Sequence, residues 1–410
     1  MNVLFLTSTL PRFAGDMQAG FVIEQASAWR SARPADTICV LAPHDLGAPL
    51  SEVVDGIRIE RFRYFIPERW QKLAYPAILP NLRRHPVLWL QVLPFLMAEY
   101  RATRRLVRRL RPDVIYAHWV MPQGLVAWML GRALGVPYIL QNHSSDLSVF
   151  FKAGRMGRSL ATSVLRGAAH FFCVNAAQRD LALGLFAGPE RDEFANRCTV
   201  LPMGIAAVPV SEEPGNGRFD IATIARLSRK KGLHYLIQAC EGLASRGVRP
   251  RIGIAGDGED RSLLEGMVKR ADIVFPGFLS GEAKDRFLSE AGRFAFPARA
   301  ADGDVEGLPV ALLEALARGV PVLASRDTNI EQLPEWPQIR DAVVFVEDPA
   351  DVPALELALE RLLAVDPRAV RYVSDVIGKY RWDRLIDEYI AAAMQALQPG
   401  TGEGITSLAK

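Results

Sequence analysis

The sequence predicts an α/β protein made of two doubly wound, parallel-sheet domains. Short apolar strand patterns alternate with helical patterns through the first half of the chain, and the same alternation restarts in the second half. A Pro-, Gly- and Glu-rich stretch at 207–217 separates the two blocks. Such alternation is typical of a parallel sheet with helices on both faces. A chain of 410 residues is long enough for two such domains.

The first block is expected to form an N-terminal domain over residues 1–207. Its strand patterns are short apolar runs bounded by turn residues, as in strands buried on both faces. The predicted strands are 2–6, 36–42, 113–119, 137–143 and 170–175, with helices at 18–32 and 122–135.

After a linker at 208–217, the second block is expected to form a C-terminal domain over 218–381. Its predicted strands are 219–227, 251–258, 272–277, 293–298, 320–325 and 342–348. A helix is predicted at about 309–318, because Pro309 stands just inside its start and Gly319 just past its end. We expect a last helix at 382–397 to pack back on the N-terminal domain, and a loose tail at 398–410.

The bulk composition narrows the class of protein. Residues 1–210 hold 24 Lys and Arg against 15 Asp and Glu, whereas residues 211–410 hold 25 against 31. The excess of basic residues in 1–210 suggests that this half contacts an anionic ligand or surface. The four cysteines form no C-x-x-C pair, and neither a signal peptide nor an apolar run of 18 residues is evident. These features predict a cytoplasmic protein with reduced, buried thiols.

Two doubly wound domains imply a cleft, and ligands of open parallel sheets bind beyond the carboxyl ends of the strands. Arg226 lies at the end of one predicted strand, and Lys231 follows five residues later at the start of a helix. Two cations beside a helix N-terminus favour a bound phosphate. A solvated basic turn would give the same pattern.

Two further strand ends carry weaker signals. Gly256 belongs to a Gly-Asp-Gly turn that resembles a phosphate loop but is equally ordinary turn chemistry. Phe278 follows the next strand and is a candidate to flank a nucleotide base. A phenylalanine of the core or of a loop is the alternative.

Two carboxylates lie eight positions apart, at Glu306 and Glu314. On a helix this spacing gives a rise of roughly 12 Å and an angle of roughly 80°. Such a pair could bracket a diphosphate, one glutamate holding a ribose diol. The alternative is that both are solvated glutamates of a helix. This alternative is less favoured because Arg226 and Lys231 precede them and also follow strands of the same sheet.

Together these motifs resemble the retaining glycosyltransferases of family four, which have the GT-B fold, over nearly the whole chain. Arg226 and Lys231 in "ARLSRKKG" match the basic pair of that family, and Glu306 and Glu314 match its E-x7-E signature. The wider run at 300–325 is most similar to transferases of bacterial exopolysaccharide and lipopolysaccharide assembly. The resemblance implies a hexose transferred, with retention and without a metal or other cofactor, from a UDP-sugar or GDP-sugar to a growing glycan or lipid-linked acceptor.

The resemblance also implies roles for individual residues. Arg226 and Lys231 would bind the donor diphosphate, Glu314 the ribose and Glu306 the transferred sugar. Preorganised cations would stabilise the charge that develops on the leaving diphosphate. The donor-binding residues expected in this way are Arg226, Lys231, Glu314, Gly15, Gly256, Phe278, Gly307 and Leu308.

Two features of the second half do not fit this resemblance directly: a D-x-D motif and an altered turn. Asp302 and Asp304 form a D-x-D motif that binds metal in another glycosyltransferase fold, and here we interpret it as loop polarity. The six histidines show no metal-ligand spacing either. The Gly-Gly-x-Pro-Glu turn that the family often has after the strand at 320–325 is replaced by "RDTNIEQL", in which Glu331 matches the acid.

The acceptor side is expected in the first half. Gly15 resembles the glycine loop that passes close to the donor phosphates, and its neighbour Asp16 is expected to face the acceptor; a surface loop is the alternative. His118 follows one predicted strand, and His143 and Asp146 follow the next. His143 matches the histidine of the family's "HGSD"-like run, so it is expected to contact the transferred sugar or position the acceptor.

Within residues 83–111 an apolar run is followed by six arginines, at Arg101, Arg104, Arg105, Arg108, Arg109 and Arg111. We expect this segment to dock the enzyme on the anionic inner face of the plasma membrane, where a lipid-linked acceptor resides. A core-packed helix with solvated arginines is the alternative. No nucleic-acid binding is expected, because the basic residues are not interleaved with exposed aromatics.

Two other functions remain open at this point. The fold also hosts sugar-nucleotide epimerases, which need no acceptor. A non-catalytic partner protein of the same fold is the second, and the complete set of Arg226, Lys231, Glu306 and Glu314 argues against it.

Overall fold

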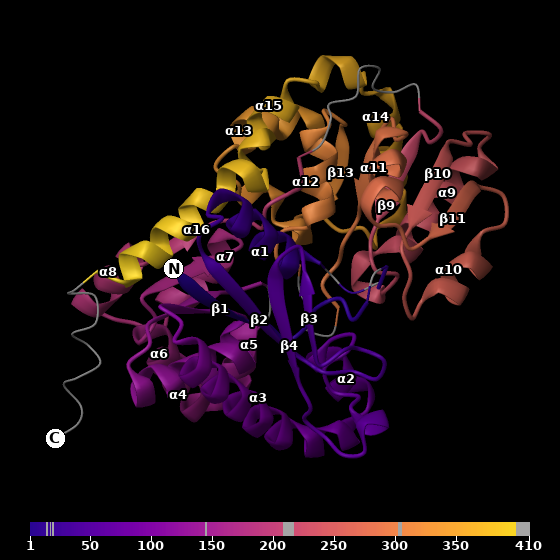
Figure 1. Ribbon diagram of the computed structural model, residues 1–410. Coiled ribbons are helices and arrows are strands. Elements are labelled where there is room, and N and C mark those ends of the chain that lie inside the picture. Colours follow the sequence, from indigo (N-terminus) through magenta and orange to yellow (C-terminus); the bar gives the residue numbers. More distant parts are fainter. Residues whose placement is uncertain are drawn as a thin grey trace. The chain divides into compact units, whose positions relative to one another are not determined.

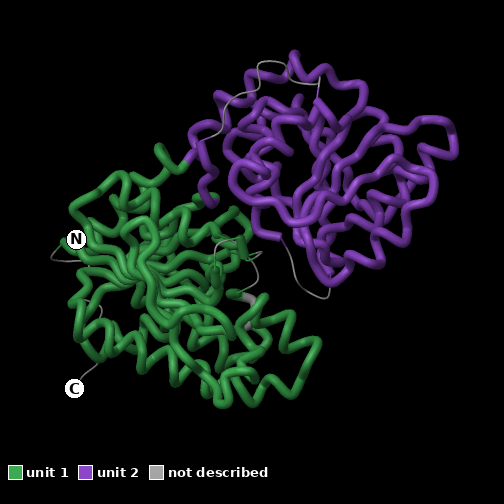
Figure 2. Tube along the Cα trace, turned by 45° about the vertical axis from the view of Figure 1, so that its right-hand side comes forward, with its two compact units in different colours: residues 1–202, 382–410 green, residues 203–381 purple. Residues whose placement is uncertain are grey.

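The computed structural model describes residues 1–13, 15–16, 18, 20–143, 146–207, 217–301 and 306–398 (Figure 1). The chain divides into two compact units: unit 1 is Met1–Pro202 with Trp382–Lys410, and unit 2 is Met203–Arg381 (Figure 2). Nearly all of the predicted linker at 208–217 and of the tail at 398–410 lies outside the described residues.

Unit 1 is built on a sheet with the strand order β3-β4-β2-β1-β5-β6-β7-β8. The strands are β1 (Asn2–Leu6), β2 (Thr37–Pro43), β3 (Ser51–Val54), β4 (Ile57–Phe62), β5 (Val114–His118), β6 (Tyr138–Gln141), β7 (His170–Cys173) and β8 (Cys198–Val200). All neighbouring strands are parallel except β3 and β4. This hairpin turns at Asp55 and Gly56, both at positive φ, as a two-residue hairpin turn requires. The predicted sheet lacked it.

Helices cover both faces of this sheet. They are α1 (Phe21–Ala32), α2 (Ile78–Arg84), α3 (Trp89–Leu110), α4 (Leu125–Leu134), α5 (Asp146–Lys152), α6 (Gly154–Arg166), α7 (Ala176–Leu183), α8 (Pro189–Asn196) and α16 (Trp382–Ala396). Within β1, Leu4 and Leu6 join the apolar cluster that includes α3 and α4. Phe5 points to the opposite face, where its ring packs against Trp29 of α1 and Tyr116 of β5. The unit is therefore doubly wound.

The last helix, α16, belongs to unit 1 and packs beside α1. Its Tyr389 is fully buried, accepts a hydrogen bond from Gln141 Nε2 at 3.1 Å and donates one to the carbonyl of Pro202 at 3.2 Å. The core of unit 1 thus includes side chains from the far end of the chain.

Unit 2 is built on an all-parallel sheet with the order β11-β10-β9-β12-β13-β14. The strands are β9 (Ile221–Ile224), β10 (Arg251–Ala255), β11 (Asp272–Gly277), β12 (Phe294–Phe296), β13 (Val322–Ser325) and β14 (Val343–Val346). The helices are α9 (Leu233–Ser245), α10 (Arg261–Met267), α11 (Gly281–Ser289), α12 (Val310–Ala317), α13 (Trp336–Ile339), α14 (Val352–Ala364) and α15 (Val373–Ile377).

The strands of unit 2 are also covered on both faces. Ile252 and Ile254 of β10 lie in one apolar cluster with residues of α9 and α14. Gly253, between them, faces α11, and a Cβ at this position would lie 2.7 Å from the ring of Phe287. The prediction of two parallel-sheet α/β domains is therefore confirmed, apart from the antiparallel edge strand of unit 1.

Candidate functional site

A basic turn follows β9 in unit 2. The turn η4 (Arg229–Lys231) ends at Gly232, whose φ is 67° and where a Cβ would lie 1.8 Å from the carbonyl oxygen of Pro297. Only glycine fits this combination of left-handed backbone and close approach. The turn therefore lies directly against the loop that follows β12.

Glu306 is the acidic partner of this turn. Its Oε1 lies 2.8 Å from Nζ of Lys231 and 3.4 Å from Nζ of Lys230. Burial alone would raise the pKa of Glu306, but the two ammonium groups outweigh it and lower the pKa to about 2. Lys231 also lies 5.1 Å from the ring centre of Phe296. The structure thus brings together the predicted Lys231 and Glu306, and adds Lys230, which sequence reasoning missed although it is the adjacent residue.

The backbone at Glu306 is held by Asn329. The side-chain amide of Asn329 donates to the carbonyl oxygens of Glu306 at 3.1 Å and of Gly307 at 2.9 Å. Asn329 itself has a φ of 57°, a left-handed conformation that asparagine tolerates. It builds the turn after β13 without the glycines that the resemblance suggested. Gly307 and Leu308 are buried beside this contact.

Glu314 lies on α12, among apolar residues, and is buried. Its Oε1 accepts a hydrogen bond from Nζ of Lys284 on α11 at 2.6 Å. Its Oε2 is buried and has no hydrogen-bond partner in the part of the chain that the structure describes. Glu306 precedes α12, which begins at Val310, in agreement with the helix predicted at about 309–318. The rise and angle of one continuous helix therefore do not describe the pair of Glu306 and Glu314.

Arg226 follows β9 and forms an ion pair with Glu259, with its Nη2 2.9 Å and its Nε 3.1 Å from Oε2. Gly256, after β10, has a φ of 131°, and a Cβ there would lie 1.8 Å from the carbonyl oxygen of Ala225. This glycine therefore lets the loops after β9 and β10 touch. Phe278 follows β11 and is half-buried.

In unit 1, the buried His118 and the half-buried His143 lie in contact at the ends of β5 and β6. Nδ1 of His118 lies 3.0 Å from Nε2 of His143, and the rings are stacked. Burial lowers the pKa of His143 to about 3 and, with a further contribution from His143, lowers that of His118 well below its ordinary value. Both imidazoles are thus neutral near pH 7. The rings of Phe21 and Trp119, which were not predicted, pack against His143.

Asp146 fixes the loops that carry this pair. Its Oδ2 accepts a hydrogen bond from the backbone N–H of Val120 at 2.8 Å. Its Oδ1 accepts from the side chain of Asn142 at 2.6 Å and from the backbone N–H of His143 at 3.3 Å. The structure therefore brings His118, His143 and Asp146 together, with Asp146 bonded to backbone groups.

Asp16 is held by an arginine that sequence reasoning missed. Arg12 Nε and Nη2 lie 2.8 Å and 2.9 Å from the two carboxylate oxygens of Asp16, and Nη1 lies 2.7 Å from Asp45. The hydrogen bond to Asp16 is the largest of the effects that raise the pKa of Arg12 above its ordinary value. Gly15 has a φ of 80°, but no atom of the described residues lies within 4 Å of where its Cβ would be. Its backbone conformation, rather than crowding, therefore favours glycine.

Among the described residues no group of three or more His, Cys, Asp or Glu side chains could hold a metal ion. Asp302 and Asp304 lie outside the residues that the structure describes. The cations that the structure shows at Glu306 are the ammonium groups of Lys230 and Lys231.

Two family models match the chain: "Glycosyl transferase 4-like domain" over residues 21–204 and "Glycosyl transferases group 1" over residues 208–374. The proposed colanic acid biosynthesis glycosyltransferase WcaL of Escherichia coli (strain K12) is 34% identical over 185 residues, which cover 43% of this chain and 45% of that protein. The match thus spans less than half of that relative. The proposed teichuronic acid biosynthesis glycosyltransferase TuaC of Bacillus subtilis (strain 168) is 26% identical over 356 residues, or 81% of this chain and 83% of that protein.

Solved structures show the same fold. Sucrose-phosphate synthase from Thermosynechococcus elongatus matches with a TM-score of 0.66 and 20% identity, over 96% of each chain.

Proposed function

The chain belongs to the GT-B glycosyltransferases that combine a glycosyl transferase 4-like domain with a group 1 domain, and we propose that it transfers a hexose from a nucleotide diphosphate sugar to a glycan or lipid-linked acceptor. The observation that carries this proposal is the buried Glu306 held between Lys230 and Lys231 in the group 1 domain. Relatives named for colanic acid and teichuronic acid biosynthesis suggest a bacterial surface polysaccharide as the product.

In the proposed site, Arg226 and Lys231 bind the donor diphosphate, while Glu314 holds the ribose and Glu306 the transferred sugar. Oε2 of Glu314, which has no hydrogen-bond partner among the described residues, leaves an acceptor for a ribose hydroxyl. Lys230 adds a third cation, and such preorganised charge favours the departure of the diphosphate. We propose that this charge takes the place of a metal ion, so that turnover persists in EDTA.

The proposed transfer retains the anomeric configuration. The bond between the sugar C1 and the phosphate oxygen breaks, and a bond from C1 to the acceptor oxygen forms on the same face. The proton of the acceptor hydroxyl passes to the leaving phosphate oxygen. Retention is supported by the E-x7-E resemblance, and an NMR spectrum of a product with inverted configuration would contradict it.

Calorimetric titration with UDP, GDP and ADP tests the donor site. We expect one nucleotide to bind, and Lys231→Ala and Arg226→Ala to weaken its binding at least tenfold. Lys269→Ala is the matched control, because Lys269 is an exposed lysine of the same unit. Glu306→Ala should keep nucleotide binding and lose transfer. If no nucleotide binds, or if Lys231→Ala and Lys269→Ala bind the nucleotide equally well, the proposed site is wrong.

We further propose that α3 docks the enzyme on an anionic membrane at the cytoplasmic face. Its N-terminal half and the preceding turn η2 (Pro86–Leu88) expose apolar side chains, and its C-terminal half exposes arginines. The exposed apolar residues are Val87, Trp89, Leu90, Leu93 and Met97, and the exposed arginines are Arg101, Arg104, Arg105, Arg108 and Arg109. In the described part of the chain no helix has the length and apolar character needed to cross a membrane. This surface therefore fits peripheral binding, to which each cation adds about 1 kcal/mol.

Co-sedimentation with phosphatidylglycerol vesicles tests the docking proposal. Trp89→Ser with Leu90→Ser should reduce binding, as should reversal of charge at Arg104, Arg105 and Arg108. Leu263→Ser is the control, since Leu263 is a similarly exposed leucine of unit 2. Unchanged binding in both sets of variants would rule this surface out.

A further inference from the structure

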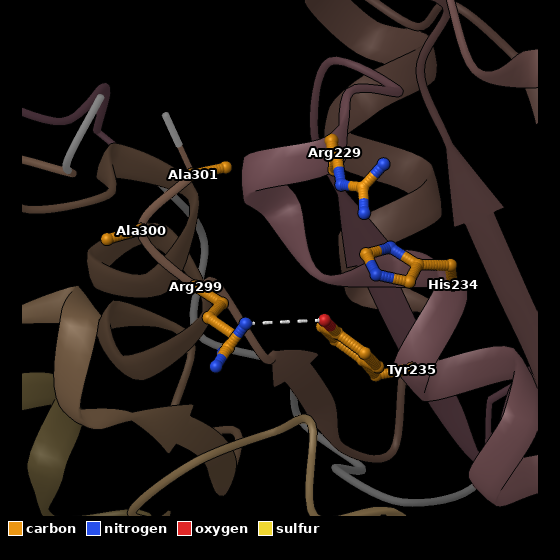
Figure 3. Close-up of a pocket in the computed structure, with 6 residues that line it drawn as sticks. All are labelled: Arg229, His234, Tyr235, Arg299, Ala300 and Ala301. Carbon is orange, nitrogen blue, oxygen red and sulfur yellow. Dashed lines mark hydrogen bonds between the residues drawn. The ribbon is translucent and has the colours of Figure 1, made fainter. Parts of the chain in front are cut away.

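A cavity of about 380 Å³ lies in unit 2, and Figure 3 shows the residues that line it. It is lined by Arg229, His234, Tyr235, Arg299, Ala300 and Ala301. Arg229 begins the turn η4, His234 and Tyr235 belong to the first turn of α9, and Arg299 follows β12. Lys231 and Glu306 are absent from this lining. The turn η4 thus supplies two lysines to Glu306 and an arginine to a separate cavity.

The polar groups of this cavity are basic or neutral. Arg229 is exposed and has no ion pair among the described residues, and it projects toward His234 in Figure 3. Arg299 is anchored to Asp348, with its Nε 2.8 Å from Oδ1, while its Nη1 lies 3.5 Å from the hydroxyl of Tyr235. Burial, and then the charges of Arg229 and Arg299, lower the pKa of His234. No acidic residue is part of the described lining, so the cavity presents two guanidinium groups beside a hydroxyl and a neutral imidazole.

We propose that this cavity binds a small molecule through a phosphate monoester. Arg229 and Arg299 would hold the phosphate oxygens, because guanidinium groups match phosphate in charge and in hydrogen-bond geometry. His234 and Tyr235 would supply further hydrogen bonds. The volume falls within the range of about 300–1,000 Å³ that is typical of small-ligand sites. It therefore leaves room for an organic group attached to the phosphate.

The cavity shares its backbone with the proposed donor site. The N–H of Arg299 donates to the carbonyl oxygen of Lys230 at 2.8 Å, which ties the loop after β12 to the turn η4. A ligand that bridges Arg229 and Arg299 would clamp the two segments that carry Lys231 and Glu306. Binding in the cavity itself does not depend on the transferase function proposed above.

His234 provides a direct probe, because it is the one histidine between residues 203 and 381. In protein labelled with ¹⁵N-histidine, titration with inorganic phosphate should shift the His234 ring signals saturably. Arg229→Gln and Arg299→Gln should each weaken this binding at least tenfold, which corresponds to about 1.4 kcal/mol. Both arginines are partly exposed, so we expect these variants to keep their melting temperature.

Two control variants separate this site from others. Arg326→Gln removes another exposed, ion-paired arginine of unit 2, and should bind phosphate like the wild type. Lys231→Gln should weaken nucleotide binding but keep the phosphate shift at His234, so that failure of one site is distinguishable from failure of the other. No shift, or equal affinity in wild type and Arg229→Gln, would overturn the proposal.

The origin of the phosphate is resolved by comparing glycerol 3-phosphate with vesicles that contain phosphatidic acid. Competition by glycerol 3-phosphate alone supports a free metabolite, and competition by the vesicles supports a lipid headgroup. Competition by chloride at the same concentration as phosphate would show unspecific anion binding and overturn the proposal.

Discussion

Replacement of Glu306 by glutamine should destabilise unit 2 in a pH-dependent way. In the wild type the ammonium groups of Lys231 and Lys230 lower the pKa of Glu306 from an ordinary 4.5 to about 2. A lowered carboxyl pKa stabilises the folded state above the ordinary pKa, and this contribution is lost as the pH falls through the folded-state value. A difference of about 2.5 pKa units corresponds to about 3 kcal/mol at pH 7, and about 1 kcal/mol of it remains at pH 3.

The assay exploits Trp336, which is the one tryptophan between residues 203 and 381. With 5-fluorotryptophan incorporated, the ¹⁹F signal of Trp336 reports urea unfolding of unit 2 separately from unit 1. The free energy of unfolding is then measured for wild type and Glu306→Gln from pH 7 to pH 3. We expect the difference to shrink from about 3 to about 1 kcal/mol over this range.

Glu347→Gln is the matched control for this experiment. Oε2 of Glu347 lies 2.9 Å from Nη1 of Arg326, a separation close to the 2.8 Å between Glu306 and Lys231. The side chains of Glu347 and Arg326, however, are both about 70% exposed. Exposed pairs contribute little to stability, so this variant should match the wild type at every pH. A Glu306→Gln difference that is independent of pH, or no larger than that of Glu347→Gln, would refute the assigned role of the two lysines.

Three further predictions concern backbone and buried charge. Gly256→Ala should fail to fold stably, because its Cβ would lie 1.8 Å from the carbonyl oxygen of Ala225, whereas Gly266→Ala meets open space and should keep the wild-type melting temperature. Asn329→Ala should lower the free energy of unfolding, measured in urea, by about 1 kcal/mol more than Asn329→Gly does. Both variants lose the side-chain amide, but glycine adopts the left-handed φ of this position without strain. Burial raises the pKa of Glu99 to about 8, so wild-type stability should fall as the pH rises from 4.5 toward 8. Glu99→Gln should abolish this fall and stabilise unit 1 by about 3 kcal/mol at pH 7, as thermal melts at several pH values would show.

The pattern of short apolar strands between helices was sufficient to predict the two sheets, because strands buried on both faces need continuous apolar runs. The hairpin of β3 and β4 was missed because its strands are half-exposed and carry charged residues. The Asp55–Gly56 pair was the available signal for it. The strand β8 has three residues, too few for a periodic pattern.

The proximity of Lys231 and Glu306 followed from the order of motifs after strands of one sheet. The residues that hold Glu306 and Glu314 in place could not be predicted from the sequence, because these contacts depend on tertiary packing. Lys284 reaches Glu314 from a different helix, and Asn329 reaches Glu306 from the turn after another strand. Neither residue carries a local sequence signal. The assignment of roles to these side chains stays a prediction until the titrations and variants above are measured.

The position of α16 bears on how the protein is made. Unit 2 is complete once residue 381 has been synthesised, whereas unit 1 still lacks the helix that fills its core with Tyr389. Domains usually fold in N-terminal to C-terminal order during translation. In this chain the order of completion is reversed, because the surface of the unit 1 core that α16 covers stays uncovered until residues 382–396 have been synthesised.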